Sequence, residues 1–103
     1  PVLDAFVRAL PRTYRDVDAP AGTLVALSIT GDAGGRWLLR REDSLWSLYE
    51  GHEPAAAEVT LDPDTAWRAF TNGISPETTR QNAQIAGDEW LARQMLAATA
   101  IIA

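Results

Sequence analysis

The chain contains no cysteine and a single histidine, His52, among its 103 residues. The lack of cysteine excludes disulfide bonds, thiolate metal sites and a cysteine nucleophile. One histidine cannot supply a metal site made of several histidines from the same chain, so no metal site is predicted. Apolar runs are also short, and none approaches the roughly 18 residues that a membrane-spanning helix requires. We therefore expect a cytoplasmic protein without a membrane partner.

Positive charge is scarce as well. Nine Lys and Arg residues stand against 14 Asp and Glu residues, which gives a net charge of −5. A small acidic chain repels phosphate backbones, so a nucleic-acid partner is not expected. Hydrophobic residues make up 47% of the chain, which is typical of a globular domain. Residues 1–103 are therefore predicted to form a single domain. Because the first residue is proline, we expect a processed chain or a fragment of a longer protein.

Residues 3–16 show the periodicity of an amphipathic helix. The apolar positions fall within about 100° of one another on a helical wheel; they are Leu3, Phe6, Val7, Leu10 and Tyr14. The opposite side carries Arg8, Arg12 and Arg15. Because Pro11 removes a backbone donor and clashes with the preceding turn, the helix is predicted to kink or break near Leu10.

Between residues 23 and 61 the hydrophobic period changes to two, as expected for β-strands. The predicted strands are residues 23–30, 36–41, 45–50 and 57–61. The glycine-rich segment 31–35 supplies the positive-φ positions of a hairpin turn. Segment 45–50 is apolar on both faces, so another part of the chain is expected to cover its second side.

Beyond residue 61 the sequence returns to helical patterns. A helix start is indicated by a capping aspartate, a proline at the first helical position and a second acid; these are Asp62, Pro63 and Asp64. The predicted buried face of this helix consists of Ala66, Trp67 and Phe70. Gly73 is predicted to end the helix.

A second, shorter helix start occurs at residues 75–77, and residues 83–86 are long enough only for a fifth strand. Asp88 then caps a final helix, whose apolar face is formed by Leu91, Met95, Ala98 and Ile102. The order of elements is therefore helix, four strands, helices, strand and helix. This order predicts an α+β domain with helices packed on one face of a sheet.

Several motifs in the second half of the chain carry a resemblance to a known family. They are VTLDPDTAWRAFTNG at residues 59–73, ISPETTR at 74–80, IAGD at 85–88 and the terminal AIIA. With these motifs the chain resembles the C-terminal domain of the mycothiol-dependent maleylpyruvate isomerase family. The resemblance extends over the whole chain, is loosest in residues 23–51, and includes no catalytic motif.

The resemblance implies a sterol-carrier-protein-like fold: a five-stranded, mostly antiparallel sheet with helices on one side. It also implies a longer parent protein, whose N-terminal DinB-like bundle is absent from this chain. In the family, that bundle binds a divalent metal through three histidines and carries most of the mycothiol chemistry. This chain would then hold no cofactor itself and would have the bundle as its partner. The parent could be a mycothiol-dependent isomerase or transferase, but this chain is not expected to be an enzyme on its own.

The family also contributes an arginine from this domain to the active site between the two domains. Arg80 is the nearest basic residue in the corresponding region, and Gln84 follows it before the last helix start. Long hydrogen-bond donors suit a carboxylate-bearing ligand. Arg80 and Gln84 are therefore the predicted substrate-binding residues, and no catalytic residue is predicted.

Other residues that could carry chemistry have simpler structural interpretations. His52 and Glu53 lie in a turn sequence, which favours solvated side chains over a general base or a metal ligand pair. Asp62 and Asp64 are interpreted as helix-start residues rather than as cation ligands. Segment 31–35 lacks the Gly-Lys-Ser/Thr ending of a phosphate-binding loop, and no serine lies in a nucleophile elbow.

The tryptophans leave two functional hypotheses open. Either they fill a small core or some of them line an apolar cavity; they are Trp37, Trp46, Trp67 and Trp90. The leading hypothesis is a non-catalytic accessory domain that packs on a metal-binding bundle and walls its cleft, beside a small anionic ligand. The alternative is a stand-alone carrier of an apolar, lipid-like or sterol-like ligand. An accessory domain should expose apolar side chains where its partner docks, whereas an isolated carrier should hide them.

Overall fold

A computed structural model describes residues 2–32, 34–72 and 74–102. Elements follow the predicted order, and Gly73, the predicted helix end, lies outside the described residues. The helices are α1 (Val2–Val7), α2 (Leu10–Thr13), α3 (Pro63–Asn72), α4 (Pro76–Gln81) and α5 (Glu89–Ile102). The strands are β1 (Leu24–Ile29), β2 (Gly35–Glu42), β3 (Leu45–Glu50), β4 (Ala57–Leu61) and β5 (Gln84–Gly87).

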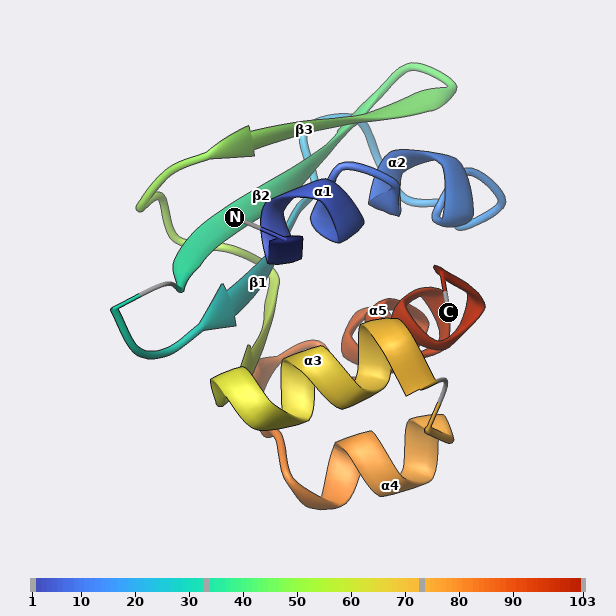
Figure 1. The fold of residues 1–103 in the computed structure, drawn as a ribbon. Coiled ribbons are helices and arrows are strands. Elements are labelled where there is room, and N and C mark those ends of the chain that lie inside the picture. The colour runs from blue at the N-terminus through green and yellow to red at the C-terminus, as the bar shows by residue number, and fades with distance from the viewer. Residues whose placement is uncertain (1, 33, 73, 103) are drawn as a thin grey trace.

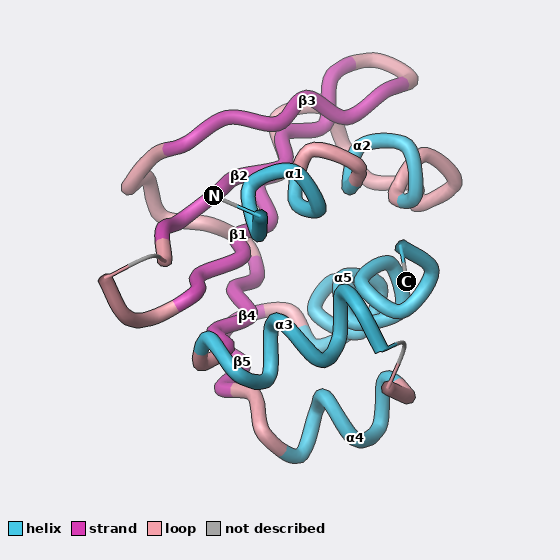
Figure 2. The backbone as a smooth tube through the Cα atoms, in the orientation of Figure 1, coloured by secondary structure: helices cyan, strands magenta, loops and turns pink. Residues whose placement is uncertain are grey.

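The five strands form one sheet in the order β3-β2-β1-β4-β5. β1 pairs in parallel with β4, whereas the β1–β2, β2–β3 and β4–β5 pairs are antiparallel. The helices lie on one side of this sheet (Figure 1), and the tube view in Figure 2 shows the same separation of strands and helices. The predicted α+β class and the mostly antiparallel five-stranded sheet are thus confirmed.

The core lies between the inner face of the sheet and the helices. Along β1, the side chains of Val25, Leu27 and Ile29 alternate onto this face, as the period of two predicted. Phe70 from α3 and Met95 from α5 meet them from the helical side, and both are fully buried. Packing of these apolar side chains out of water provides the main stabilisation of the fold.

The N-terminal helix is interrupted as Pro11 predicted. α1 ends at Val7 and α2 begins at Leu10, so the proline lies in the first turn of α2. There its missing N–H costs no helical hydrogen bond. Both helices keep the predicted apolar face, since Val7, Leu10 and Tyr14 are fully buried.

Tyr14 connects these N-terminal helices to the last helix. Its hydroxyl donates to the carbonyl oxygen of Leu91 at 2.9 Å, and its ring meets the Trp46 ring edge-on, with centroids 4.8 Å apart. Burial, with a smaller effect from the negative charge of Asp88, raises the pKa of Tyr14 well above its ordinary value. The hydroxyl therefore remains a protonated donor at neutral pH and holds α2 against α5.

Arg41 is a buried charge on the inner side of β2. Its Nη1 donates to the carbonyl oxygen of Val17 at 3.1 Å, and Nη2 donates to Asp18 Oδ1 at 3.4 Å. The guanidinium also lies 5.6 Å from the centroid of the Trp46 ring, close enough for a cation–π contact. These contacts hold the loop after α2 against the sheet. They also compensate the buried charge of Arg41, which would be strongly destabilising without partners.

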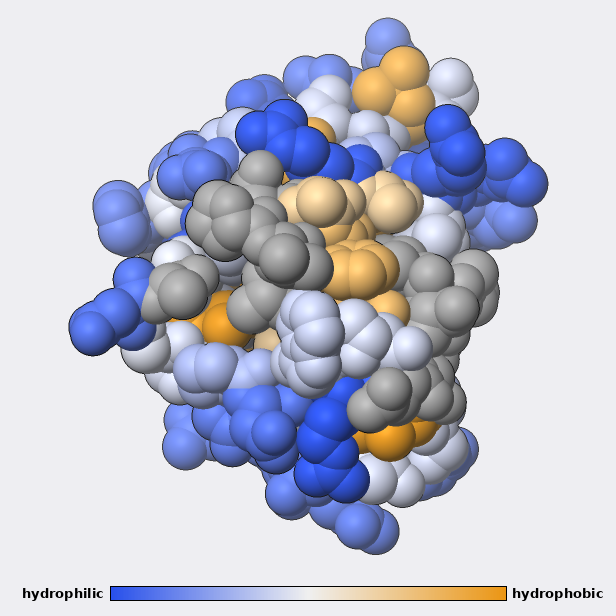
Figure 3. All heavy atoms as spheres, viewed as in Figure 1, coloured by the Kyte–Doolittle hydropathy of each residue, from blue (hydrophilic) through white to orange (hydrophobic). Residues whose placement is uncertain are grey.

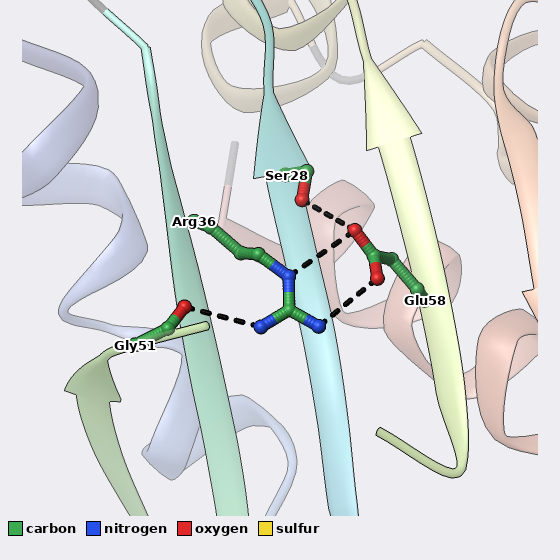
Figure 4. A network of polar contacts seen from close by, with 4 residues as sticks. All are labelled: Ser28, Arg36, Gly51 and Glu58. Atoms are coloured by element: carbon green, nitrogen blue, oxygen red, sulfur yellow. Dashed lines mark hydrogen bonds and ion pairs between the residues drawn. The ribbon is translucent and has the colours of Figure 1, made fainter. Parts of the chain in front are cut away.

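The outer face of the sheet carries a polar clamp that joins three strands (Figure 4). Arg36 Nη2 and Nε donate to Glu58 Oε1 and Oε2 at 3.0 and 3.3 Å, and Nη1 donates to the carbonyl oxygen of Gly51 at 3.1 Å. Ser28 Oγ donates to Glu58 Oε2 at 2.6 Å. The hydrogen bonds from Arg36, and less so from Ser28, lower the pKa of Glu58 despite its partial burial.

Residues 51–56, called the strap below, cross the sheet because β3 and β4 lie on either side of β2 and β1. Gly51 at its start packs on Leu38: a Cβ there would lie 3.0 Å from Leu38 Cδ1. Leu38 is fully buried even though it points away from the helices. The Tyr49 hydroxyl donates to Glu53 Oε2 at 2.9 Å. The strap thus contacts Tyr49 on the second side of β3, but Leu45 on the same side is 54% exposed, so the predicted cover of this side is only partial.

The four tryptophans divide into two pairs. Trp37 and Trp46 are 7% and 4% exposed and belong to the core, whereas Trp67 and Trp90 are 45% and 51% exposed. The prediction that Trp67 belongs to the buried face of α3 is therefore wrong. The buried face centres instead on Ala66, Ala69 and Phe70, and Trp67 lies roughly 100° round the helix from Ala66.

Candidate functional site

Helix α4 places Arg80 at the surface. Ser75 caps the helix, since its hydroxyl accepts from the backbone N–H of Thr78 at 3.1 Å, and Pro76 and Glu77 occupy the first turn. The helix start predicted at residues 75–77 is confirmed. Arg80 consequently lies in the last turn, where its side chain is exposed.

The start of α5 is determined by two adjacent residues. Gly87 has a φ of +83°, and a Cβ there would clash with the carbonyl oxygen of Ala56, so this position requires glycine. Asp88 caps the helix by accepting from the Leu91 N–H at 3.0 Å. Glu89 follows in the first turn, where a negative charge is favoured by the helix dipole.

Between α4 and α5 lies a groove of about 540 Å³, lined by Pro76, Glu77, Arg80, Glu89, Arg93 and Leu96. Its volume is in the range of small-molecule sites, roughly 300–1,000 Å³. Glu89 Oε1 lies between two guanidinium groups, 3.5 Å from Arg80 Nη2 and 3.8 Å from Arg93 Nε. These distances are long and the side chains are substantially exposed, so the ion pairs are weak. An anionic ligand can therefore compete with Glu89 for both arginines.

The two predicted substrate-binding residues lie in different places. Arg80 lines the groove, whereas Gln84 lies exposed on β5, opposite Thr60 of β4, and is not among the lining residues. Glu89 and Arg93 were not singled out from the sequence. Their spacing of four residues does predict a mutual ion pair, but only tertiary packing brings that pair to Arg80.

A second, smaller groove of about 230 Å³ lies at the β3 edge of the sheet. It is lined by Arg8, Trp37, Leu48, Tyr49 and Glu50. Its volume is below the usual range for a small-molecule site. We therefore consider the α4–α5 groove the stronger candidate.

The acidic residues considered as cation ligands have structural partners. Asp62 Oδ1 accepts from the Thr65 N–H at 2.6 Å, and this backbone hydrogen bond lowers the pKa of Asp62. Asp64 Oδ2 lies 3.6 Å from Arg68 Nη1, one turn along α3. The helix-start interpretation is therefore confirmed for Asp62. Across residues 2–32, 34–72 and 74–102, no three His, Asp or Glu side chains are grouped so as to hold a metal ion.

The clamp on the outer face does not have the chemistry of a nucleophile and base. Ser28 donates to Glu58, but the same carboxylate accepts two hydrogen bonds from Arg36. Because the pKa of Glu58 is lowered, this carboxylate is a weak base. The cluster therefore has a structural role, in which it links β1, β2 and β4.

Most of the large apolar side chains are buried, and a few are exposed. Large side chains such as Tyr14, Phe70 and Met95 are fully buried in the interior. Both grooves have charged side chains in their walls. The large hydrophobic residues exposed in the described part of the chain are Leu45, Trp67 and Trp90. No described helix has both the length and the apolar character needed to cross a membrane.

Comparisons with sequence models of protein families and with curated protein sequences find no match. Several solved structures nevertheless share the fold. A UbiJ-SCP2 ubiquinone synthesis protein aligns with a TM-score of 0.62 at 10% identity, covering 99% of this chain and 96% of that one. Sterol carrier protein 2 like 2 from Aedes aegypti aligns with a TM-score of 0.65 at 13% identity, covering 92% and 94%.

The palmitated form of the Aedes aegypti protein aligns similarly, with a TM-score of 0.64 at 14% identity, covering 93% of this chain and 92% of that one. At such identities, structural similarity establishes the fold and leaves the function to be argued from the site. This agrees with the fold implied by the sequence resemblance. The chain has the fold of the sterol carrier proteins.

Proposed function

We propose that this chain is a non-catalytic accessory domain of a maleylpyruvate-isomerase-like protein, packed on a helical bundle and walling one side of its cleft. The observation that carries the proposal is the half exposure of Trp67 and Trp90 on the surface of the helical layer. Tryptophan is enriched in protein interfaces, where a large rigid side chain is buried by the partner. Exposed apolar side chains are what an accessory domain requires and an isolated carrier should hide.

The α4–α5 groove supports a role in holding an anionic ligand. Arg80 and Arg93 both line it, and each is held only by a long ion pair to Glu89. A carboxylate of a ligand lying between the two domains can accept charge-assisted hydrogen bonds from both guanidinium groups. Gln84, on the edge strand that follows α4, is proposed as a more peripheral donor.

The metal and the mycothiol would belong to the bundle. The described residues offer no grouped set of metal ligands, and the sequence has no thiol. The isomerase or transferase chemistry of the parent protein would accordingly take place in the bundle, in the cytoplasm. This domain would contribute binding and orientation of the anionic group.

The proposal is tested by adding a histidine-bearing bundle of a maleylpyruvate-isomerase-like protein to the isotope-labelled chain and recording backbone amide spectra. We expect saturable shift changes that map to one contiguous surface. An unrelated four-helix bundle of similar charge is the control and should leave the spectrum unchanged. Equal responses to both bundles, or no response to either, would contradict the accessory role.

The alternative is a carrier of an apolar ligand, favoured by the fold shared with sterol carrier proteins, including one solved in palmitated form. A carrier would have to open the packed interface between the sheet and the helices. Palmitate is the direct probe. Under the accessory proposal it should leave tryptophan fluorescence and the melting temperature unchanged. A saturable blue shift, with a stabilisation that grows with palmitate concentration, would favour the carrier instead.

A further inference from the structure

The α4–α5 groove is lined by charges of both signs in equal number. Its lining includes two guanidinium groups, those of Arg80 and Arg93, and two carboxylates, those of Glu77 and Glu89. All of these side chains are exposed to water. Figure 3 shows hydrophilic side chains gathered around α4, in the lower part of the view. The groove is therefore close to neutral as a whole, although the chain has a net charge of −5.

The two carboxylates of this groove differ in their partners. Glu89 Oε1 lies 3.5 Å from Arg80 Nη2 and 3.8 Å from Arg93 Nε, so the two guanidinium groups share one carboxylate oxygen. Glu77 lies in the first turn of α4 and forms no ion pair within the described part of the chain. A ligand carboxylate that takes the place of Glu89 between the arginines therefore leaves two negative charges in the groove without a cation.

This charge balance selects the class of ligand. A simple anion exchanges one carboxylate for another at the arginines and leaves Glu89 unpaired beside it, so repulsion between like charges offsets the gain. A simple cation can pair with Glu77 or Glu89, but it draws Glu89 away from the guanidinium groups. A molecule with both charges on neighbouring atoms supplies a carboxylate to the arginines and an ammonium group to the displaced Glu89 carboxylate.

We propose that the α4–α5 groove binds a small zwitterion of the α-amino acid type. Its carboxylate would lie between Arg80 and Arg93, and its ammonium group would face Glu89. Pro76 and Leu96 also line the groove and favour a ligand with an apolar side chain. The inference rests on the part of the proposed function in which this groove holds a carboxylate. It adds the second charge of the ligand, and it makes Glu89 the residue that selects for that charge.

The test uses three probes of similar shape: leucine, isocaproate, which is leucine without the ammonium group, and isoamylamine, which is leucine without the carboxylate. Each is titrated into the isotope-labelled chain at neutral pH and constant ionic strength, and backbone amide shifts report the site and the affinity. We expect leucine to shift residues 76–80 and 89–96 and to bind about threefold more tightly than either other probe, as one added exposed ion pair allows. Equal affinity for leucine and isocaproate, no saturable leucine binding, or a footprint elsewhere would overturn the proposal.

The variant Glu89→Gln tests the selecting residue. It removes both the anion that competes for the arginines and the partner of the ligand ammonium group, while it keeps the size of the side chain. Isocaproate should therefore bind this variant more tightly than it binds the parent chain, and the preference for leucine should shrink. Glu42→Gln neutralises an exposed glutamate on β2; it is the control and should leave both affinities unchanged. An unchanged preference for leucine in Glu89→Gln would contradict the assignment.

The variant Arg93→Gln tests the carboxylate end of the site. It should weaken binding of leucine and isocaproate but not of isoamylamine, whereas Arg40→Gln, which neutralises an exposed arginine on β2, should change none of them. These variants alter only exposed side chains, and their circular dichroism spectra and melting temperatures check folding.

The outcomes separate this inference from the proposed function. If isocaproate binds as tightly as leucine and Arg93→Gln weakens both equally, the groove is a site for simple anions, so the proposed function stands and the zwitterion assignment fails. If leucine binds as expected but the histidine-bearing bundle leaves the spectrum unchanged, the accessory role fails and the zwitterion site stands.

Discussion

On its inner face the sheet is covered by helices and packed with apolar side chains such as Leu27, Val59 and Phe70. On its outer face lies the strap, which is held by the Arg36–Glu58 clamp and by a hydrogen bond from Tyr49 to Glu53. The inner face depends on removal of apolar area from water, which is insensitive to pH. The outer face depends on charge-assisted hydrogen bonds, which are lost when a carboxylate is protonated.

This contrast indicates where a ligand or partner can be accommodated. The inner face carries fully buried side chains, and a ligand there would have to enter between the sheet and the helices that cover it. On the outer face, the polar groups of the clamp form hydrogen bonds with one another. Among the described residues, groups that remain available include those that line the α4–α5 groove and the exposed Trp67 ring on α3.

The largest expected effect is on the inner face. Phe70→Ala should lower the free energy of unfolding by about 3–5 kcal/mol, because it removes a fully buried ring and leaves a cavity. Urea denaturation followed by tryptophan fluorescence measures the loss. Trp67→Ala on the same helix is the control and should cost clearly less, because Trp67 is half exposed. A comparable loss in the two variants would contradict the contrast between anchored and exposed rings.

The outer clamp should contribute less. Glu58→Gln should lower the free energy of unfolding by about 1–3 kcal/mol, since it weakens charged hydrogen bonds from Arg36 and Ser28 at a partly exposed site. Chemical denaturation at neutral pH measures the change. Glu42→Gln is the matched control on the same sheet. Glu42 accepts one hydrogen bond from Ser47 at an exposed position, so Glu42→Gln should lower the free energy of unfolding by less than Glu58→Gln.

The same clamp should make stability depend on pH. The pKa of Glu58 is lower in the folded protein than its ordinary value of 4.5. Its contribution is therefore complete above pH 4.5 and is lost as the pH falls through the folded pKa. Glu58→Gln should reduce this acid-dependent loss in denaturation curves recorded from neutral pH to pH 3. An unchanged pH profile would show that the clamp does not stabilise the outer face.

A smaller effect is expected from the buried hydrogen bond between Tyr14 and Leu91, which links α2 to α5. Tyr14→Phe should lower the free energy of unfolding by about 0.5–1.5 kcal/mol, because the hydroxyl no longer donates to the Leu91 carbonyl. Tyr49→Phe, which removes an exposed hydrogen bond to Glu53, is the control and should change stability less. Thermal denaturation of both variants decides the comparison. A larger loss in Tyr49→Phe would mean that the strap outweighs the link between α2 and α5.

The smallest effect on stability is expected in the α4–α5 groove. Arg80→Ala should stay within about 0.5 kcal/mol of the parent chain, because its ion pair with Glu89 is long and exposed. In the proposed full-length protein, isothermal titration should show anionic ligand binding weakened by about 1–3 kcal/mol. Arg40→Ala, which removes an exposed arginine from β2, should leave that binding unchanged. A loss of several kcal/mol in the isolated chain would make Arg80 a structural residue.

Much of the local structure could be predicted because its causes are local. Pro11 interrupted the N-terminal helix, Asp62 and Ser75 capped the helices that follow them, and β3 and β4 have the predicted bounds. Each of these outcomes depends on backbone donors, dihedral limits or a hydrophobic period within a few residues. The placement of Arg80 in an exposed last turn has the same kind of cause.

What only the tertiary structure decided depends on residues far apart in the sequence. The hydrophobicity of Trp67 predicted burial, but α3 buries Ala66, Ala69 and Phe70 and leaves Trp67 45% exposed. The spacing of Glu89 and Arg93 is compatible with an ion pair along α5, but only the approach of α4 to α5 placed Arg80 beside them and left Gln84 outside. Local sequence determines which elements form, whereas packing of the whole core determines which side chains remain available at the surface.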